Sequence, residues 1–253
     1  MSFADLKKKS SNNLQFLQKE LEKTVSTRQV DERFWKPEVD ASGNGYAVIR
    51  FLPAPDGETV PWAKVYSHAF QGPGGWYIEN SLTTLGDKDP VGEVNRRLWN
   101  DGTEEGKDVA RRQKRKLSYY SNIQVIKDPK HPENEGKVFL YKYGKKIHDK
   151  ILAAMQPEFQ DETPVNVFDL WEGANFKLKI KKVAGFWNYD SSEFDSVSAL
   201  SSDDTELEAT WKQEHSLEAF TARDQFKSYE DLEKRLKLVL GNSCLLYTSP
   251  SPR

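Results

Sequence analysis

The chain has 253 residues, of which 37% are hydrophobic, 30% charged and 12% aromatic, and its formal net charge is −2. That length is enough for one large domain or two small ones. The single cysteine, Cys244, excludes an internal disulfide and a zinc site built from several cysteines. No apolar run approaches the roughly 20 residues of a membrane-spanning helix, and the polar N-terminus lacks the apolar core of a signal peptide. We therefore expect a protein of the reducing cytoplasm without a membrane partner.

The N-terminal third predicts one helix and then strands. Leucines at positions 14, 17 and 21 have helical spacing, and a basic run precedes them. A Gly-Asn-Gly turn at 43–45 leads into a β-rich segment at 46–53, which ends in proline. Further strands are expected at 64–70 and 76–78, joined by the glycine-rich turn at 72–75.

A helix is predicted next. Asp89 precedes Pro90, a residue favoured at the first helical position, so Asp89 is the expected N-cap. Val91, Val94 and Leu98 then share one face of that helix.

The remaining elements are mainly strands. We expect strands at 119–126 and 137–144, a helix through Ile147, Ile151 and Met155, and a strand pair at 165–168 and 175–183. A last helix is indicated by the capping signature of Ser228 and Asp231 and by an apolar face, and Gly241 fits its end. Short strands with flanking helices predict a mainly β fold with α additions, built on an OB-fold barrel core.

The near-neutral total charge conceals two segments of opposite sign. Residues 107–150 contain 13 Lys and Arg against 5 Asp and Glu, whereas residues 186–235 contain 5 against 13. One basic and one acidic surface are therefore expected.

Aromatic residues interleave with the cations of the basic segment, as single-strand binders require for stacking on bases and tracking phosphates. Tyr119 and Tyr120 follow a basic run, and strand alternation allows at most one of them to stack while the other packs in the core. Tyr141 and Tyr143 flank Lys142, and a third ring cluster follows at 186–189. The plainer interpretation is that such rings pack and such lysines are solvated.

Other functions compete with this one. A metal-dependent nuclease would need clustered carboxylates or histidines. The dense acidic residues Asp203, Asp204, Glu206 and Glu208 favour a solvated face instead, or a scaffold that binds only proteins. A single-stranded RNA binder also stays open, because nothing in the sequence shows how the 2′-hydroxyl would be treated. We expect a binder and not an enzyme.

Several ordered blocks are similar to the single-stranded DNA-binding protein of T-even-type bacteriophages. They include Lys-Arg-Lys-Leu-Ser-Tyr-Tyr at 114–120, Pro-Glu-Asn-Glu-Gly-Lys-Val-Phe at 132–139, Gly-Lys-Lys-Ile at 144–147 and Trp-Glu-Gly-Ala-Asn-Phe at 171–176. The resemblance runs from about residue 5 to residue 241. It implies an OB-fold protein that coats single strands cooperatively during phage replication, recombination and repair, with phage replication and recombination proteins as partners in the infected bacterial cell.

Site residues follow from the resemblance and from the basic and aromatic pattern together. The resemblance implies DNA-facing roles for Arg50, Trp99, Tyr119, Tyr141, Phe186 and Tyr189. The pattern adds Lys114, Arg115, Lys116, Lys142, Tyr143 and Lys145. The resemblance also implies self-association through Lys7, Lys8, Lys9, Ser10 and Ser11, a motif with a second copy at 114–118.

Two features depart from that family. Its zinc site uses one histidine and three cysteines, but the matching positions here are His68, Ser81, Val91 and Val94. Serine and valine are not zinc ligands. We therefore expect no metal and no cofactor, interpret His68 as a surface histidine, and hypothesise that apolar packing of the valines replaces the metal. The family's acidic C-terminal tail does not follow Gly241, so we expect either a truncated sequence or a form without the regulation that the tail provides.

We expect three segments along the chain. Residues 1–22 form a basic arm and helix for self-association, and residues 23–241 form the DNA-binding core. Residues 242–253 resemble translated adapter sequence and are expected to be a non-native tail.

Overall fold

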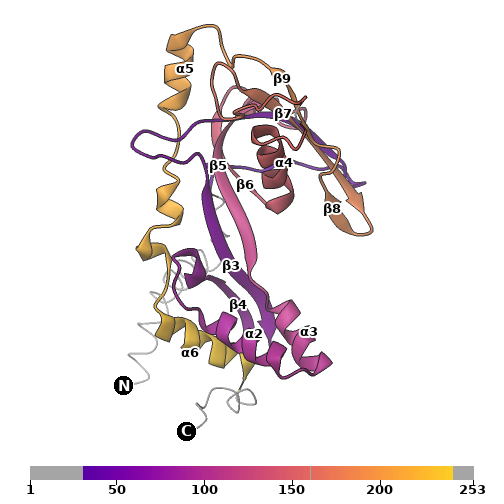
Figure 1. The fold of residues 1–253 in the computed structure, drawn as a ribbon, viewed down its shortest axis with the longest axis vertical. Coiled ribbons are helices and arrows are strands. Elements are labelled where there is room, and N and C mark those ends of the chain that lie inside the picture. Colours follow the sequence, from indigo (N-terminus) through magenta and orange to yellow (C-terminus); the bar gives the residue numbers. More distant parts are fainter. Residues whose placement is uncertain (1–30, 160, 242–253) are drawn as a thin grey trace, which may run out of the picture. The chain divides into compact units, whose positions relative to one another are not determined.

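The computed structural model describes residues 31–159 and 161–241 (Figure 1). The predicted N-terminal helix, the self-association motif at 7–11 and the predicted non-native tail lie outside these residues. The chain divides into two compact units, Met1–Phe34 and Trp35–Arg253. Of the first unit, residues 31–34 are described, and there the guanidinium of Arg33 lies 2.7 Å from the Asp31 carboxylate. Within the described part of the chain, no helix combines the length and the apolar character needed to traverse a bilayer.

Nine strands make up the sheet of the described chain. They are β1 (Phe34–Trp35), β2 (Gly45–Phe51), β3 (Ala63–Gly72), β4 (Gly75–Asn80), β5 (Lys116–Lys127), β6 (Val138–Tyr143), β7 (Ala174–Val183), β8 (Phe186–Asn188) and β9 (Glu193–Val197). Strand β5 is central, since it pairs antiparallel with β2, β3 and β6. Strand β2 also pairs with β7, and β7 pairs with β8 and β9.

The helices of the described residues follow or separate these strands. They are α2 (Pro90–Asn100), α3 (Glu104–Arg112), α4 (Lys145–Met155), α5 (Asp204–Trp211) and α6 (Tyr229–Leu240), with short 3-10 turns η1 (Leu82–Thr84), η2 (Pro132–Asn134), η3 (Glu218–Phe220) and η4 (Arg223–Gln225). The predicted class, mainly β with helical additions, is confirmed. The OB-fold name remains a prediction.

Local signals located most elements correctly. The strands expected at 46–53, 64–70, 76–78, 119–126, 137–144 and 175–183 correspond to β2, β3, β4, β5, β6 and β7. Asp89 is the N-cap of α2, and its side chain accepts hydrogen bonds from the backbone N–H groups of Val91 and Gly92. Ser228 caps α6 and accepts from the N–H of Asp231 at 3.1 Å. Gly241 ends that helix with φ 72°, a value that favours glycine.

The strand predicted at 165–168 is wrong. This segment is irregular, with the Val165 N–H donating to the carbonyl of Ala154 at 2.9 Å. Val167 and Phe168 are buried in the core, so their apolar character reflects packing and not sheet formation. Strands β8 and β9 and helix α3 are additions that the sequence patterns do not predict.

Buried side chains form two main apolar clusters. The first apolar cluster lies between β2, β5, β6, β7 and α4 and includes Phe51, Ile123, Leu178 and Ile151. The second apolar cluster lies where α2, α3 and α6 gather beside the β3–β4 hairpin (Figure 1). It contains the predicted apolar faces of α2 and α6, namely Val91, Val94, Leu98, Leu232, Leu236 and Val239.

The β3–β4 turn is closed against the end of α6. The N–H of Gly74 donates to the carbonyl of Val239 at 2.8 Å. A Cβ at Gly74 would lie 1.8 Å from the carbonyl oxygen of Leu238, so only glycine permits this backbone approach. The second apolar cluster therefore joins segments that are far apart in sequence.

Candidate nucleic-acid interface

Strands β3, β5 and β6 bring one row of basic and aromatic side chains together. Lys64 of β3 lies opposite Tyr119 of β5, and Tyr119 lies opposite Tyr143 of β6. Directly opposed residues of antiparallel strands point to the same face and contact each other. The register therefore places a lysine and two tyrosines side by side, although they are far apart in sequence.

Cations lie over ring faces on both sides of this sheet. The guanidinium of Arg115 lies 4.1 Å from the ring centre of Tyr66, and the Lys64 ammonium lies 5.4 Å from it. On the opposite face, the Lys142 ammonium lies 5.4 Å from the ring centre of Tyr120. Such contacts stabilise a cation next to a flat surface, by about 0.5–1 kcal/mol at exposed sites. Both faces of the sheet thus offer positive charge and rings together.

The exposed cations of this surface differ in how they are paired. Lys145 contacts Asp149 at 2.7 Å, and Lys146 contacts Asp190 at 3.2 Å. Among the described residues, by contrast, no carboxylate lies within ion-pair distance of the following exposed cations: Lys64, Lys114, Arg115, Lys116 and Lys142. These cations remain available to an external anion.

The predicted division of Tyr119 and Tyr120 between two faces is confirmed. Tyr119 is buried in the first apolar cluster, whereas Tyr120 is half-buried on the other face and stacks on Phe220 at 4.4 Å. Burial also raises the pKa of Tyr119, because the ionised phenolate is disfavoured away from water.

The rings of Tyr141 and Tyr143 require a correction. Both are buried, stack on each other at 5.6 Å, and have pKa values raised by burial. Tyr143 in turn stacks on Tyr119 at 5.7 Å. A ring covered on its faces by neighbours cannot accept a base there, so the prediction of base stacking on Tyr141 does not fit this packing. These rings are core residues with edges toward the surface.

Arg50 was expected to face DNA, but its side chain is fully buried. It donates to the Asn175 side chain at 3.3 Å and to the carbonyl of Ser198, and burial lowers its pKa. An arginine enclosed in this way cannot reach a phosphate. Its place between β2 and β7 indicates a structural role.

Two hollows border the interface. The larger, of about 720 Å³, we call the α2–α3 cleft; it is lined by basic side chains and by the half-exposed Trp99. The cations of its wall are Lys88, Arg96, Arg111, Lys114 and Arg115. Arg111 lies 5.5 Å from the ring centre of Trp99. The smaller hollow, of about 270 Å³, is lined by edges of Tyr141 and Tyr143 together with Lys142, Lys146 and Tyr189.

The β7–β8 hairpin presents a third group of rings. Its turn contains Ala184 and Gly185, with φ of 49° and 84°. Phe186, just beyond the turn, is 79% exposed, and Trp187 is also exposed. Tyr189 is half-buried and borders the smaller hollow, and burial raises its pKa. Of the rings expected to stack on bases, Phe186 and Trp99 are the ones with a free face of substantial area.

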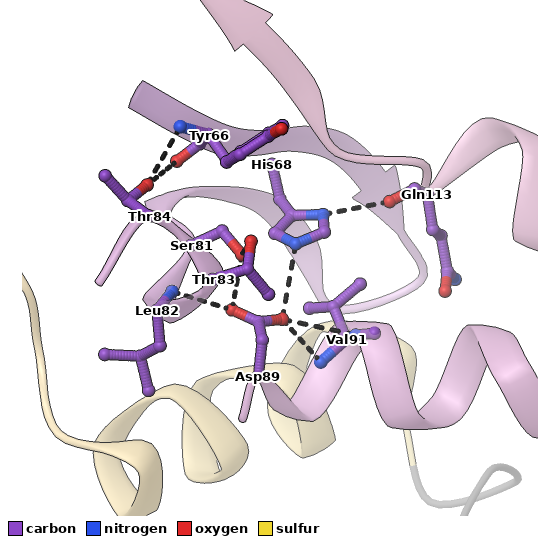
Figure 2. Close-up of polar contacts among 10 residues, drawn as sticks. Tyr66, His68, Ser81, Leu82, Thr83, Thr84, Asp89, Val91 and Gln113 are labelled. Carbon is purple, nitrogen blue, oxygen red and sulfur yellow. Dashed lines mark hydrogen bonds and ion pairs between the residues drawn. The ribbon is translucent and has the colours of Figure 1, made fainter. Parts of the chain in front are cut away.

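The interpretation of His68 as a surface histidine is wrong, because His68 is buried and lines the α2–α3 cleft. Figure 2 shows its ring between Gln113 and Asp89. Its Nδ1 lies 3.0 Å from the carbonyl oxygen of Gln113. Its Nε2 lies 3.3 Å from Oδ1 of Asp89, an ion-pair distance when the ring is protonated, although the geometry is poor for a hydrogen bond. The histidine is thus held from two sides by protein groups.

Asp89 is the centre of this polar group (Figure 2). Its Oδ2 accepts from the Ser81 hydroxyl at 2.9 Å and from the Leu82 N–H at 3.1 Å, while Oδ1 accepts from the N–H groups that begin α2. Burial alone would raise the pKa of Asp89, but these contacts and His68 together hold it below its ordinary value. The carboxylate is therefore kept charged in a buried position.

The four positions that match the family's zinc site do not fit a zinc ion. Ser81 is committed to Asp89, and Val91 and Val94 are buried in the second apolar cluster. Zinc requires thiolate, imidazole or carboxylate ligands, normally four. Within the described residues, no group of three or more His, Cys, Asp and Glu side chains is arranged to hold a metal. The predicted packing of the two valines is confirmed.

Sequence reasoning missed Lys64, Tyr66, Arg96 and Arg111, which border the same surface as the basic run. Lys64 and Tyr66 reach it only because β3 pairs with β5 in one register. No local pattern encodes that register. The self-association residues at 7–11 lie outside the described residues.

Comparison with known proteins identifies the family of the chain. The family model described as "gp32 DNA binding protein like" matches residues 43–240. The single-stranded DNA-binding protein of Enterobacteria phage T2 is 45% identical over 222 residues, covering 85% of this chain and 72% of that protein. The protein of the same name from Enterobacteria phage T4 is 42% identical over 246 residues, covering 94% of this chain and 80% of that protein. The chain belongs to the gp32-like family of DNA-binding proteins.

Proposed function

We propose that this protein binds single-stranded DNA with little regard to sequence and coats exposed strands during phage replication, recombination and repair. The observation that carries the proposal is the set of exposed cations around 64, 114–116 and 142 that have no carboxylate partner among the described residues and lie beside aromatic rings. Relatives named as phage single-stranded DNA-binding proteins support it.

The chemistry of the surface favours single strands over duplex. A single strand offers phosphates to the cations and unstacked bases to exposed rings. Phe186 and Trp99 supply free ring faces, at the β7–β8 hairpin and at the α2–α3 cleft. The roles proposed for Lys114, Arg115, Lys116, Lys142 and Lys145 are phosphate contacts. Four further rings would support this surface from the core and present only their edges to the DNA, namely Tyr119, Tyr141, Tyr143 and Tyr189.

The test is a salt series with fluorescently labelled oligo-dT. Binding should weaken as salt rises, with a slope of log K against log salt near −0.7 for each phosphate that the protein neutralises. Replacing Lys114, Arg115 and Lys116 with glutamine should reduce both affinity and slope. Lys237→Gln is a matched control, because Lys237 is on α6 and pairs with Glu233 at 2.9 Å. An affinity for oligo-dT that does not change with salt concentration would refute the proposal.

Self-association is a further part of the proposal. The basic motif at 7–11 recurs as Lys-Arg-Lys-Leu-Ser at 114–118, and the resemblance implies that it joins neighbouring protomers. Deleting residues 1–11 should abolish cooperative binding to long poly-dT and leave binding to a short oligonucleotide intact. Equal loss of both would contradict this role. We further propose phage replication and recombination proteins as partners, and the cytoplasm of the infected bacterium as the place of action.

RNA binding and nuclease activity were the alternatives from sequence, and the relatives favour neither. Incubating labelled oligo-dT with Mg²⁺ separates a nuclease from a binder, since only a nuclease shortens the strand. Competition by oligo-U against oligo-dT measures the preference for DNA.

A further inference from the structure

The polar group beneath the α2–α3 cleft connects to the basic run through a single residue. His68 contacts the carbonyl of Gln113, and Gln113 immediately precedes Lys114. We propose that Asp89 and His68 are positioning residues for DNA binding: without a bound metal, they fix the point where the chain leaves α3 and the basic run 114–116 enters β5. This inference rests on the proposed function of that run.

The Asp89 end of the pair is anchored to two elements. One carboxylate oxygen accepts from Ser81 and Leu82 at the start of η1, and the other accepts from Val91 and Gly92 at the start of α2. A buried carboxylate with this many donors has one well-defined orientation, because turning it would leave several buried N–H groups without acceptors. Asp89 is therefore a rigid support for the histidine beside it.

The His68 end reaches the end of α3. A carbonyl oxygen only accepts hydrogen bonds, so Nδ1 of His68 must carry the hydrogen of its 3.0 Å contact with Gln113. Gln113 is the C-cap of α3 and is buried, and carbonyls at a helix end have no partner within the helix. The histidine supplies that partner, and it therefore fixes where the helix stops.

The cations begin at the next residue. Lys114 and Arg115 line the same cleft whose floor contains His68 and Asp89. Arg115 lies over the ring of Tyr66, and Lys116 lies opposite Ser67, so the run is aligned along the part of β3 that directly precedes His68. Moving the Gln113 carbonyl would shift these cations relative to Lys64. The spacing of the positive charges that contact the DNA phosphates would then change.

This arrangement explains how the site keeps its shape when its residues do not fit zinc. In the related family one ion would join β3, the segment after β4 and α2. Here hydrogen bonds of Asp89 join the segment after β4 to α2, and His68 of β3 lies 3.3 Å from the same carboxylate. The hydrogen bond of His68 to Gln113 also reaches α3. Val91 and Val94 fill the space between with apolar side chains. The pair is thus a metal-independent support for the basic run.

The experiment compares His68→Leu, Asp89→Asn and Thr103→Ala by oligo-dT binding across a salt series and by urea unfolding. Leucine removes the donor to Gln113, and asparagine keeps a helix cap but loses the charge next to His68. Thr103 is the matched control, because it caps α3 by accepting from the Gly106 N–H at 3.1 Å, and its hydroxyl otherwise bonds to Asp101. The purified wild-type protein is also assayed for zinc and titrated with a chelator.

We expect both pair variants to bind oligo-dT more weakly than wild type, with the salt slope reduced in magnitude by about 0.7 for each phosphate that is no longer neutralised. Thr103→Ala should lower the urea midpoint and keep the wild-type slope and affinity. The chelator should change neither binding nor unfolding. If His68→Leu does not fold, His68→Asn is measured instead; it retains a donor for Gln113 and should give an intermediate slope.

Two results would overturn the inference. One is wild-type affinity and slope in folded pair variants, which would make the pair structural only. The other is equimolar zinc in the wild-type protein together with loss of DNA binding on chelation. Failure of the wild-type protein to show salt-dependent binding would instead refute the proposed function, so the two failures are distinguishable.

Discussion

The imidazole of His148 lies flat against the ring of Tyr119, with ring centres 3.8 Å apart and an interplanar angle of 16°. Trp62 meets the same imidazole edge-on at 5.7 Å. The histidine is only 7% exposed, and its Nδ1 has no hydrogen-bond partner among the described residues. A neutral ring suits this aromatic site, and a charged one does not.

Stability should therefore depend on pH through His148. Burial lowers the pKa of His148 below its ordinary value of 6.5, and the lysines at 64 and 145 lower it further, while Asp149 acts in the opposite direction. The folded state thus binds this proton less readily than the unfolded state. The associated stability is fully present above pH 6.5 and is lost as pH falls below it. Urea midpoints measured from pH 8 to pH 5 should show this loss.

Replacing His148 with phenylalanine should keep the ring stack and flatten that pH dependence. His131→Gln is the comparison, because the exposed His131 donates hydrogen bonds to the carboxylates of Glu133 and Glu38, which raise its pKa. That pairing stabilises the fold at low pH and is lost as pH rises through the folded pKa, so removing it should leave the loss below pH 6.5 in place. An unchanged pH profile in His148→Phe would contradict the assignment.

Truncating Tyr141 should mainly destabilise the fold. The ring is 4% exposed and packs edge-on against Trp35, so Tyr141→Ala removes core packing worth about 3–5 kcal/mol. Equilibrium urea unfolding measures the change. A fully stable Tyr141→Ala protein would show that the ring is not part of the core.

Truncating Phe186 should weaken DNA binding and leave the stability of the fold almost unchanged. The ring is exposed at the β7–β8 hairpin, so its loss should alter stability by no more than about 0.5 kcal/mol. If a base stacks on it, Phe186→Ala should weaken oligo-dT binding by about 1–3 kcal/mol. Trp171→Ala, another exposed ring on a different segment, serves as the control in the same anisotropy assay. Equal effects of the two substitutions would argue against a specific stacking role.

A buried carboxyl group should make the protein less stable at alkaline pH. Burial, reinforced by the negative charge of Glu58, raises the pKa of Glu214 to about 8. Its oxygens lie in the interior, and the neighbouring Asn122 side chain offsets only part of the effect of burial on the pKa. The folded state therefore holds this proton more tightly than the unfolded state, and stability falls as pH rises from about 4.5 to about 8.

Glu214→Gln should remove that pH-dependent penalty. The variant is expected to unfold at a higher temperature than wild type at pH 8, with a smaller difference at pH 5. Glu230→Gln, at an exposed position in the first turn of α6, is a suitable control. A Glu214→Gln protein that loses stability at pH 8 would show that the carboxylate is paired when ionised.

The structure could be predicted from the sequence where a local signal determines it. Asp89 before Pro90 predicted an N-cap, and the valines after it predicted a buried helical face; both are confirmed. Strand alternation also separated Tyr119 from Tyr120 correctly. These features depend on a few neighbouring residues, and propensity and periodicity describe them well.

The wrong predictions concern residues whose burial depends on segments far away in the sequence. Whether Arg50 or Tyr141 faces solvent depends on which segments pair with β2 and β6 and pack over them. No local sequence pattern encodes that arrangement. The segment 165–168 was apolar enough for a strand, but it packs into the first apolar cluster without pairing. The partnership of His68 with Asp89 and Gln113 likewise joins three elements that only the fold brings together.

The contact between Gly74 and the end of α6 has a consequence for synthesis on the ribosome. The second apolar cluster needs Val239, which is made long after the β3–β4 hairpin, whereas the first apolar cluster is complete by about residue 194. The hairpin's apolar residues can pack against α2 and α3 soon after synthesis, but they lack the α6 part of their cluster through the translation of more than half the chain. Chains at that stage are prone to aggregation, and a nascent chain that stalls before α6 emerges would be a natural target for chaperones.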